Sequence, residues 1–326
     1  MRLKISEARA LALDILRRHR FGEEDAGIVA DHLVDAHLTG YTFAGLPRLL
    51  VVLRRLRERP EEIPGPVRTL SQTPVSAALD GQDTLGYVAC RRAVDIAVDK
   101  ARESGIAVVS VANAYYSGRS GYYTERAARQ GLVALHASHA SRMVAPTGGS
   151  EPVLGSNPFT FAAPTAGDPL VVDLSTAAIT WGEIQLAQRV GEPLPEGVAV
   201  DCDGEPTTDP AAALLGAALP WGGHKGYALS LVVQTLGVLA GGDLTPDHYG
   251  SFGFLFLVWR PDLLLPEGEF ETRMGALLDT VRSSRPAAGS PGILVPGERG
   301  RASRAAALAA GHIELPDRVY EDLLAL

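Results

Sequence analysis

Apolar positions recur with helical spacing in the first part of the chain. The spacing predicts helices over residues 6–20, 23–38 and 46–57, with Ser6 at the start of the first helix and a glycine after each of the first two. Each predicted helix has an apolar face that must be buried against another element. We therefore expect a helical N-terminal region.

Short β-branched and apolar runs predict strands in the middle of the chain. An amphipathic helical pattern at 84–104 separates the first two strands, which favours a strand, helix, strand crossover. Further along, we expect a helix that begins at Ser175 or Thr176 and a long apolar helix at 224–239. The predicted strands are 75–79, 106–111, 132–136, 158–163, 169–173 and 252–259.

This arrangement of elements predicts an α/β (α+β) fold with helical ends and a sheet-rich middle. We divide the chain into two lobes, a helical domain of residues 1–74 plus 220–326 and an inserted sheet-rich domain of residues 75–219. The chain has no G-x-G-x-x-G motif between a strand and a helix. A Rossmann fold is therefore not expected.

Composition and charge exclude some classes of function. The net charge of −8 argues against nucleic-acid binding, because phosphate neutralisation requires clustered Lys and Arg. The longest apolar stretch, 228–240, is too short to span a bilayer. The two cysteines, Cys90 and Cys202, fit a reducing cytoplasm better than a disulfide framework. We expect a cytoplasmic protein with no nucleic-acid, membrane or metal partner.

Candidate chemistry is concentrated in residues 105–164. The strand at 106–111 leads into a loop, 113–121, that carries tyrosines, Ser117 and Arg119 among small and flexible residues. Binding residues concentrate on loops of this kind, because a rigid scaffold holds them. The loop is therefore a candidate wall of a functional site.

Motifs along nearly the whole chain resemble the malate/L-lactate dehydrogenase superfamily of non-Rossmann nicotinamide oxidoreductases. That superfamily includes ureidoglycolate dehydrogenase, diketogulonate reductase and piperideine-2-carboxylate reductase. The resemblance implies a two-lobed fold, a homodimer, and NADPH or NADH bound by the inserted domain. The matching motifs are V-x-N with G-x-x-G-Y-Y at 111–123, A-P-x-G-G-x-E-P at 145–152, G-S-N-P-F-x-F-A-A-P at 155–164, P-L-V-V-D-L-S-T at 169–176, P-E-G-x-A-x-D-x-D-G-x-P-T-T-D-P at 195–210 and G-G-H-K-G-Y at 222–227.

Two segments are candidates for the cofactor site. Asp173, Leu174 and Ser175 lie at an expected strand-to-helix turn, where free N–H groups favour an anion. His224 and Lys225 lie in a glycine-rich turn before the long apolar helix. Taken alone, these are an ordinary helix cap and an ordinary loop, but the resemblance implies that both contact the dinucleotide. It implies the same for Gly118, Asn157, Pro296, Gly297 and Glu298.

The resemblance also implies a small 2-oxo or 2-imino acid as the substrate. Arg48 matches the arginine of the family's L-P-R motif, and a guanidinium can grip a carboxylate with two parallel hydrogen bonds. The alternative is an ordinary surface arginine. Arg142 is a second candidate for the substrate carboxylate. His139 occupies a position that is polar in the family and is a candidate for the pocket lining.

Both histidines of the family pattern are missing. The position of the proton-donating histidine of D-S-H-G is Ala44 or Tyr41, and the histidine of N-H-F-G is replaced by Tyr116. A tyrosine would need a neighbouring cation to lower its pKa from about 10 before it could donate a proton near neutral pH. Tyr41 and Tyr116 are therefore the candidate catalytic residues, with packing as the alternative, and His37 is a third candidate.

The missing imidazoles favour reduction of a C=N bond. A ketone needs a proton in the transition state, whereas an imine can arrive already protonated. We therefore predict an NAD(P)H-dependent oxidoreductase that transfers hydride to C2 of a small 2-imino acid. Its rivals are a dehydrogenase of the 2-oxo and 2-hydroxy acid type and a binding module that has lost catalysis.

Overall fold

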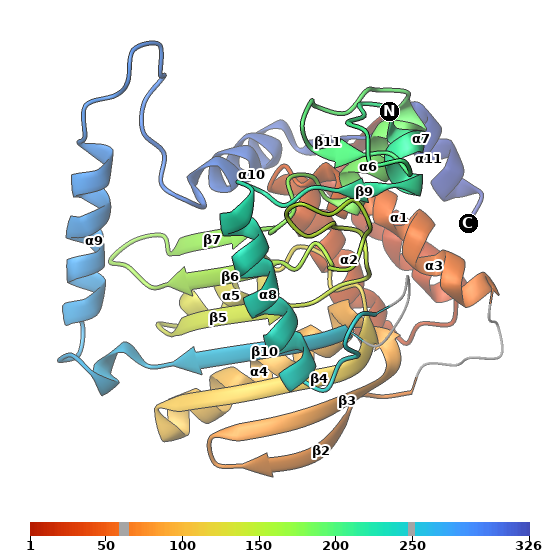
Figure 1. Ribbon diagram of the computed structural model, residues 1–326. Coiled ribbons are helices and arrows are strands. Elements are labelled where there is room, and N and C mark those ends of the chain that lie inside the picture. Colours follow the sequence, from red (N-terminus) through yellow and green to blue (C-terminus); the bar gives the residue numbers. More distant parts are fainter. Residues whose placement is uncertain (59–64, 247–251) are drawn as a thin grey trace.

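A seven-stranded mixed sheet forms the centre of the molecule (Figure 1). In order across the sheet, its strands are β2 (Arg68–Thr73), β3 (Ser76–Leu85), β4 (Ile106–Tyr115), β10 (Phe252–Trp259), β5 (Val133–Ser138), β6 (Phe159–Ala163) and β7 (Leu170–Leu174). The computed structural model describes residues 1–58, 65–246 and 252–326.

The sheet confirms the expected non-Rossmann α/β fold. Strands β3 and β4 are parallel and are joined by α4 (Gly86–Ser104), which is the crossover that the sequence predicts. The other neighbouring strands of this sheet are antiparallel. A Rossmann sheet is mostly parallel, so this topology excludes it.

Helices cover both faces of the sheet (Figure 1). α4 and α5 (Gly121–Ala128) pack on one face, and α8 (His224–Leu239) packs on the other. The inner side of α8 buries Ser230, Val233 and Gly237. Its outer side exposes Leu231, Val232 and Leu239. That apolar outer side is not covered by any part of the chain that the structure describes.

A helical layer built from both ends of the chain lies beside the sheet. α2 packs on α4 and on α1, and the two-stranded ladder of β1 (Arg2–Lys4) and β11 (His312–Glu314) joins the two ends. The layer contains α1 (Ile5–Arg18), α2 (Glu23–Leu38), α3 (Leu49–Glu58), α10 (Glu298–Ala310) and α11 (Asp317–Leu324). Two 3₁₀ turns, η1 (Thr42–Ala44) and η2 (Leu46–Arg48), connect α2 to α3.

A smaller unit lies between β7 and β10 in the chain and has its own apolar cluster. It consists of α6 (Trp181–Val190), β8 (Ala199–Val200), α7 (Pro210–Leu215) and β9 (Ala217–Ala218). Met143, Val144, Ile184 and Leu194 are among the buried residues of this cluster. The unit packs against η1 through α6 and so closes one side of the space beside the sheet.

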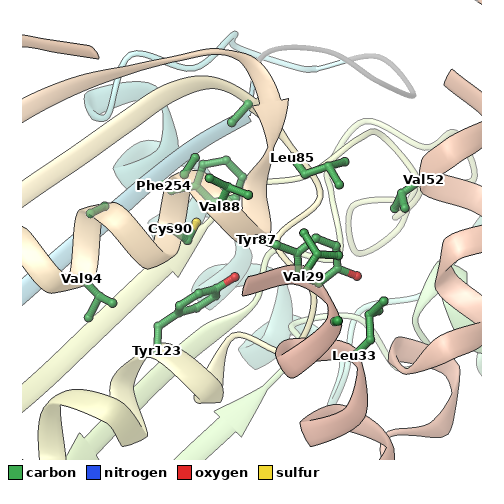
Figure 2. Packing of buried hydrophobic residues seen from close by; sticks show 14 of the residues in the cluster. Val29, Leu33, Val52, Leu85, Tyr87, Val88, Cys90, Val94, Tyr123 and Phe254 are labelled. Atoms are coloured by element: carbon green, nitrogen blue, oxygen red, sulfur yellow. The ribbon is translucent and has the colours of Figure 1, made fainter. Parts of the chain in front are cut away.

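The main core lies between α2, α4, α5 and the sheet (Figure 2). Tyr87, Cys90, Tyr123 and Phe254 are fully buried there and belong to the same apolar cluster as Leu33 of α2. Each large side chain buried in this way stabilises the fold by about 1.5–3 kcal/mol. The core therefore holds the start of α4, and with it the loop after β4, in a fixed position.

One predicted helix start is wrong. The helix expected from Ser175 or Thr176 begins at Trp181, because Thr180 makes the stronger cap. Thr180 Oγ1 accepts the Glu183 N–H at 3.3 Å, and the Glu183 carboxylate accepts the Thr180 N–H at 2.8 Å, which forms a capping box. The hydroxyl groups of Ser175 and Thr176 instead donate to the Ser156 carbonyl at 2.9 and 3.1 Å.

Other differences concern strands. The pattern does not predict β2, and β3 and β4 continue beyond the predicted ends at 79 and 111. β10 lies on the C-terminal side of residue 219, yet it is hydrogen-bonded between β4 and β5. The division of the chain into domains at 74 and 219 stays a prediction.

α9 (Glu269–Arg282) stands apart from the body of the molecule (Figure 1). Leu278 is its one buried residue, whereas the exposed fractions of Leu277 and Val281 are 52% and 40%. A helix of this length is marginal in water without packing. The residues that follow α9 are exposed as far as Gly292 and then lead into α10.

No helix in the described part of the chain is long and apolar enough to cross a membrane. Cys90 is buried and Cys202 is exposed, and neither forms a disulfide. The cytoplasmic location that cysteine usage favours stays a prediction.

Candidate active site

Two hollows meet beside the ends of β4 and β7. The first, the inner cavity, has a volume of about 510 Å³ and is lined by η1, η2, the loop after β4 and the start of α6. The second, the outer cleft, has a volume of about 1320 Å³ and extends from β7 to α10. The residues that line both define the junction: Tyr41, Phe43, Arg119, Asp173, Leu174, Ser175 and Thr180.

The loop after β4 is held in an unusual backbone conformation. Tyr116 has a φ of +48°, which is rare for an aromatic residue, and Gly118 has a φ of +74°. A Cβ atom on Gly118 would overlap His32 Nε2 and the Tyr87 ring, so only glycine fits there. Both residues line the inner cavity. Strain of this kind concentrates at functional sites.

Arg48 is buried in the wall of the inner cavity and is not a surface arginine. Its Nη1 donates to Gln185 Oε1 at 3.1 Å, and its guanidinium carbon lies 4.5 Å from the centre of the Tyr116 ring. Its Nε is buried without a hydrogen-bond partner among the described residues. Gly182 packs so tightly against the guanidinium that a Cβ atom there would overlap Nη2. A buried donor without a partner suits an anionic ligand.

Arg142 lines the same cavity, and its side chain is exposed. The two arginines that the sequence proposes for the substrate carboxylate therefore face one space. Arg54 also lines this cavity and is exposed. Three arginines, Arg48, Arg54 and Arg142, thus contribute positive charge to the cavity wall.

The candidate tyrosines line the inner cavity but are weak acids. Burial raises the pKa of Tyr41, and nearby Asp173 raises it further, while Arg119 and Arg299 lower it less. Burial also raises the pKa of Tyr116 and outweighs the adjacent Arg48, which lowers it. Both hydroxyl groups stay protonated near neutral pH. They are suited to donate hydrogen bonds rather than to give up a proton.

Asp173 and Arg119 form a buried ion pair at the junction. Asp173 Oδ2 accepts the Gly121 N–H at 2.9 Å and lies 3.9 Å from Arg119 Nη1. Oδ1 of Asp173 has no hydrogen-bond partner in the described part of the chain. Burial raises the pKa of Asp173, whereas Arg119 and the Gly121 N–H lower it, and the net direction is upward. A carboxylate with a free oxygen therefore faces the point where the two hollows meet.

The outer cleft has the features of a dinucleotide site. Pro296 and Gly297 line it at the N-terminus of α10, and Gly297 has a φ of +93°. Arg299 and Arg301 extend along the same wall. Free N–H groups at a helix start, together with guanidinium groups, suit the phosphates of a nicotinamide dinucleotide. The cleft therefore fits the cofactor that the motifs imply.

The structure brings several of the proposed cofactor residues to this cleft and leaves others outside it. Asp173, Leu174 and Ser175 line both hollows, although no helix begins there. Glu298 lies beside the cleft, where its carboxylate accepts the Val295 N–H at 2.9 Å and pairs with Arg282. His224 and Lys225 are exposed at the start of α8 and line neither hollow.

Two other predicted residues, Asn157 and His139, are buried outside both hollows. Asn157 is fully buried and binds α8, since its Nδ2 donates to Ser230 Oγ at 3.0 Å and to Gln234 Oε1 at 2.9 Å. His139 is also fully buried, with Nδ1 accepting the Gly253 N–H at 2.9 Å and Nε2 donating to the Asp243 carbonyl at 2.6 Å. Neither residue lines a hollow.

His37 also lies away from both hollows. Its Nε2 donates to the Glu314 carbonyl at 2.9 Å, and burial lowers its pKa. His37 therefore joins α2 to β11.

No histidine of the described chain lines either hollow. His136 stacks on Phe256 with 4.1 Å between ring centres, and burial lowers its pKa to about 4. His32 is buried among tyrosines, and burial lowers its pKa well below the usual value. No cluster of His, Cys, Asp and Glu suited to a metal ion occurs among the described residues. Proton chemistry at the junction therefore depends on groups other than imidazole.

Arg119 is the functional candidate for which the sequence gives no role. Its position in the loop after β4 is visible in the sequence, but its partners come from α2, α5 and β7. Only the tertiary structure brings these carboxylates together. The spacing of residues in the sequence therefore cannot show that Arg119 is buried beside a cavity.

A cleft that suits a dinucleotide thus lies beside a small cavity whose lining suits an anion. The family model described as malate/L-lactate dehydrogenase matches residues 3–324, and the chain belongs to this family. It is an NAD(P)-dependent oxidoreductase.

Similar proteins carry out related but distinct reactions. L-sulfolactate dehydrogenase of Methanocaldococcus jannaschii is 36% identical over 91% of this chain and 89% of its own length. The (2R)-3-sulfolactate dehydrogenase (NADP(+)) of Chromohalobacter salexigens is 35% identical over 99% of this chain and 97% of its own. The Delta(1)-pyrroline-2-carboxylate/Delta(1)-piperideine-2-carboxylate reductase of Pseudomonas aeruginosa is 38% identical over 75% of this chain and 74% of its own.

Solved structures agree with this assignment. The sulfolactate dehydrogenase of Methanocaldococcus jannaschii superposes with a TM-score of 0.88 at 34% identity, covering 99% of this chain and 95% of that one. The delta1-piperideine-2-carboxylate reductase of Pseudomonas syringae superposes with a TM-score of 0.87 at 30% identity, covering 99% and 98%. One backbone thus carries more than one substrate class.

Proposed function

We propose that the enzyme transfers hydride from NADPH or NADH to C2 of a small cyclic 2-imino acid. This proposal depends on one observation about the junction. The buried carboxylate of Asp173 lines it, and no described residue that lines either hollow is a histidine. A protonated imine is a cation, and a carboxylate is its natural partner. A ketone would instead require a proton donor that titrates near neutral pH.

Four residues that line the inner cavity have roles in this proposal. Arg48 grips the substrate carboxylate, because its Nε is a buried donor without a described partner. Asp173 accepts the N–H of the iminium group through Oδ1. Tyr41 and Tyr116 orient the substrate as neutral hydrogen-bond donors, since burial raises the pKa of both. A reduced nicotinamide bound in the outer cleft supplies the hydride.

A second candidate function is the oxidation of a dianionic 2-hydroxy acid. Arg48 and Arg142 line one cavity, and two cations suit a substrate with two negative groups. The names of the sulfolactate and malate dehydrogenases among the relatives agree with such a substrate. In this reading Asp173 would serve as the proton acceptor.

A substrate panel separates the two candidates. The purified enzyme is assayed with NADPH and with NADH against Delta(1)-piperideine-2-carboxylate, Delta(1)-pyrroline-2-carboxylate, pyruvate, oxaloacetate and sulfopyruvate. We expect kcat/KM for a cyclic imine to exceed that for each 2-oxo acid by about tenfold or more. A preference of that size for oxaloacetate or sulfopyruvate would favour the second candidate. Loss of nicotinamide binding would contradict both.

We also propose a second copy of this chain as a partner. The outer side of α8 and one side of α9 both expose apolar residues. An apolar helix that lacks contacts within its own chain is stabilised by packing on another molecule. In a twofold dimer, both surfaces of each chain would be covered at once.

A further inference from the structure

A cluster of charged side chains extends from the junction and includes two of the junction residues. We name it the Arg119 cluster, and it consists of Asp35 of α2, Arg119, Glu125 of α5, Asp173 at the end of β7, and Arg304 of α10. The side chain of Arg119 is 5% exposed, and those of its three carboxylate partners are between 11% and 16% exposed. Charges held this far from water are costly unless they are paired.

The carboxylates of the cluster do not depend equally on Arg119. Asp35 accepts a hydrogen bond from Arg119 Nη2 at 2.9 Å and also forms an ion pair with Arg304. Glu125 forms ion pairs with three arginines, with distances of 3.1 Å to Arg119 Nη2, 2.8 Å to Arg129 Nη2 and 3.7 Å to Arg304 Nη1. Asp173 has Arg119 as its one cationic partner within the described chain, with Nη1 at 3.9 Å. Removing the charge of Arg119 would therefore affect Asp173 most.

The backbone fixes Arg119 toward the cluster. Its N–H donates to His32 Nε2 at 2.8 Å, so His32 acts as a neutral acceptor in the core. The preceding residue, Gly118, is in the left-handed region and packs against His32 and Tyr87. The guanidinium also lies over Tyr41, with 5.8 Å between its central carbon and the ring centre. Arg119 is thus held between the core and both hollows.

We propose that Arg119 is a positioning residue that keeps the Asp173 carboxylate ionised and aimed at the junction, so that a cationic substrate nitrogen meets an anion there. This inference rests on the proposed function, because it gives Asp173 the task of pairing with the iminium group. Asp35 and Glu125 hold the guanidinium in place, Arg304 pairs with both of these carboxylates, and the Gly121 N–H holds the Asp173 carboxylate.

The direction of the effect follows from the charges that face Asp173. Burial raises the pKa of Asp173, the Arg119 charge and the Gly121 N–H lower it, and Glu125 raises it. When Arg119 is replaced by a neutral residue, burial and Glu125 still raise the pKa of Asp173. The positive charge that most lowers this pKa is lost. The pKa of Asp173 then rises, so a larger fraction of the enzyme carries a neutral Asp173 at pH 7. Neutral Asp173 cannot balance the charge of the iminium group.

The test is the pH dependence of kcat/KM for Delta(1)-piperideine-2-carboxylate in the full-length enzyme. The acid limb of that profile reports the essential base of the free enzyme. In Arg119→Met we expect the acid limb to move upward by about one pH unit or more, with kcat/KM near pH 7 reduced about tenfold. Arg119→Lys keeps a charge at the site and should restore most of the wild-type profile.

Arg129→Gln is the matched control. Arg129 pairs with Glu125 of the same cluster, but its side chain is 45% exposed and no ion pair joins it to Asp173 in the described chain. We expect its acid limb to coincide with that of the wild type. A profile of Arg119→Met that superposes on the wild type would overturn the role of Arg119.

A second variant, Asp173→Asn, provides an independent test. If Arg119→Met does not fold, Asp173→Asn tests the same point, because it removes the titrating group with little change of shape. The acid limb must then disappear, and its persistence would overturn the inference. A wild-type enzyme without imine reductase activity overturns the proposed function and this inference together, whereas an active enzyme with an unmoved limb overturns only the role of Arg119.

Discussion

At the scale of single residues, the proposed role of Arg48 in substrate binding depends on the shape of its side chain and not only on its charge. Its guanidinium is fixed by Gln185, by the Tyr116 ring and by the tight approach of Gly182. The L-P-R motif identifies this arginine in the sequence, but it cannot reveal that the side chain is buried. Burial is what turns a common residue into a preorganised anion site.

A lysine at this position should bind the substrate carboxylate poorly. In Arg48→Lys we expect KM for the preferred substrate to rise about tenfold or more, because the planar fork is lost while the charge remains. Initial-rate kinetics at saturating cofactor measures the change. Arg54→Lys is the comparison, since Arg54 lines the same cavity with an exposed side chain. An unchanged KM in Arg48→Lys would mean that charge alone matters.

The missing imidazoles are also a residue-scale result. The resemblance places the replaced histidines at Ala44 or Tyr41 and at Tyr116, and all three residues line the inner cavity. It does not show that burial raises the pKa values of the two tyrosines or that Asp173 faces the same space. These properties depend on neighbours that are distant in the chain, so spacing cannot predict them.

At the scale of elements, helices were easier to predict than strand edges. The bounds of α2 and α8 agree with the pattern, because glycines lie close to both ends of each helix. β2 has six exposed residues and therefore lacks the alternation that marks a half-buried strand. β1 and β11 are three residues each and pair across the two ends of the chain, so no local signal indicates them.

The loop after β4 should tolerate no side chain at Gly118. In Gly118→Ala, the left-handed backbone is strained and the new Cβ overlaps His32 and Tyr87. We expect the free energy of unfolding to fall by about 2–4 kcal/mol, measured by urea denaturation. Gly191→Ala is a matched control, because Gly191 has nearly the same φ of +77° but nothing within 4 Å of the new Cβ.

The control should lose only about 1 kcal/mol, which is the cost of the backbone conformation alone. The difference between the two variants then measures the close packing beneath the loop. Equal losses would show that the core yields at His32 and Tyr87, and that the loop is less rigid than the structure indicates.

At the scale of the whole molecule, the proposed dimer would use α9, and the segment after α9 lines the outer cleft. α9 buries one residue, and the chain that follows it supplies Leu294, Val295, Pro296 and Gly297 to the wall of the outer cleft. A second copy that packs on α9 would hold this wall in place. Dimer formation and cofactor affinity should therefore change together.

Charges on the apolar side of α9 should separate the dimer. For the wild-type protein, we expect light scattering to give about twice the chain mass of 34.4 kDa. The double variant Leu277→Glu, Val281→Glu should have the mass of a single chain and should bind NADPH about tenfold more weakly. Thr272→Glu lies on the opposite side of α9 and should leave both values unchanged. A wild-type protein of single-chain mass would contradict the proposal.

The position of β10 has a consequence for how this protein is made. β4 and β5 leave the ribosome long before β10, yet β10 is the strand that pairs with both of them. Until Phe252–Trp259 is synthesised, the nascent chain carries two unpaired strand edges, which attract other chains. Products of premature termination before this strand should therefore aggregate or require chaperones, whereas the sheet can close as soon as the strand has left the exit tunnel.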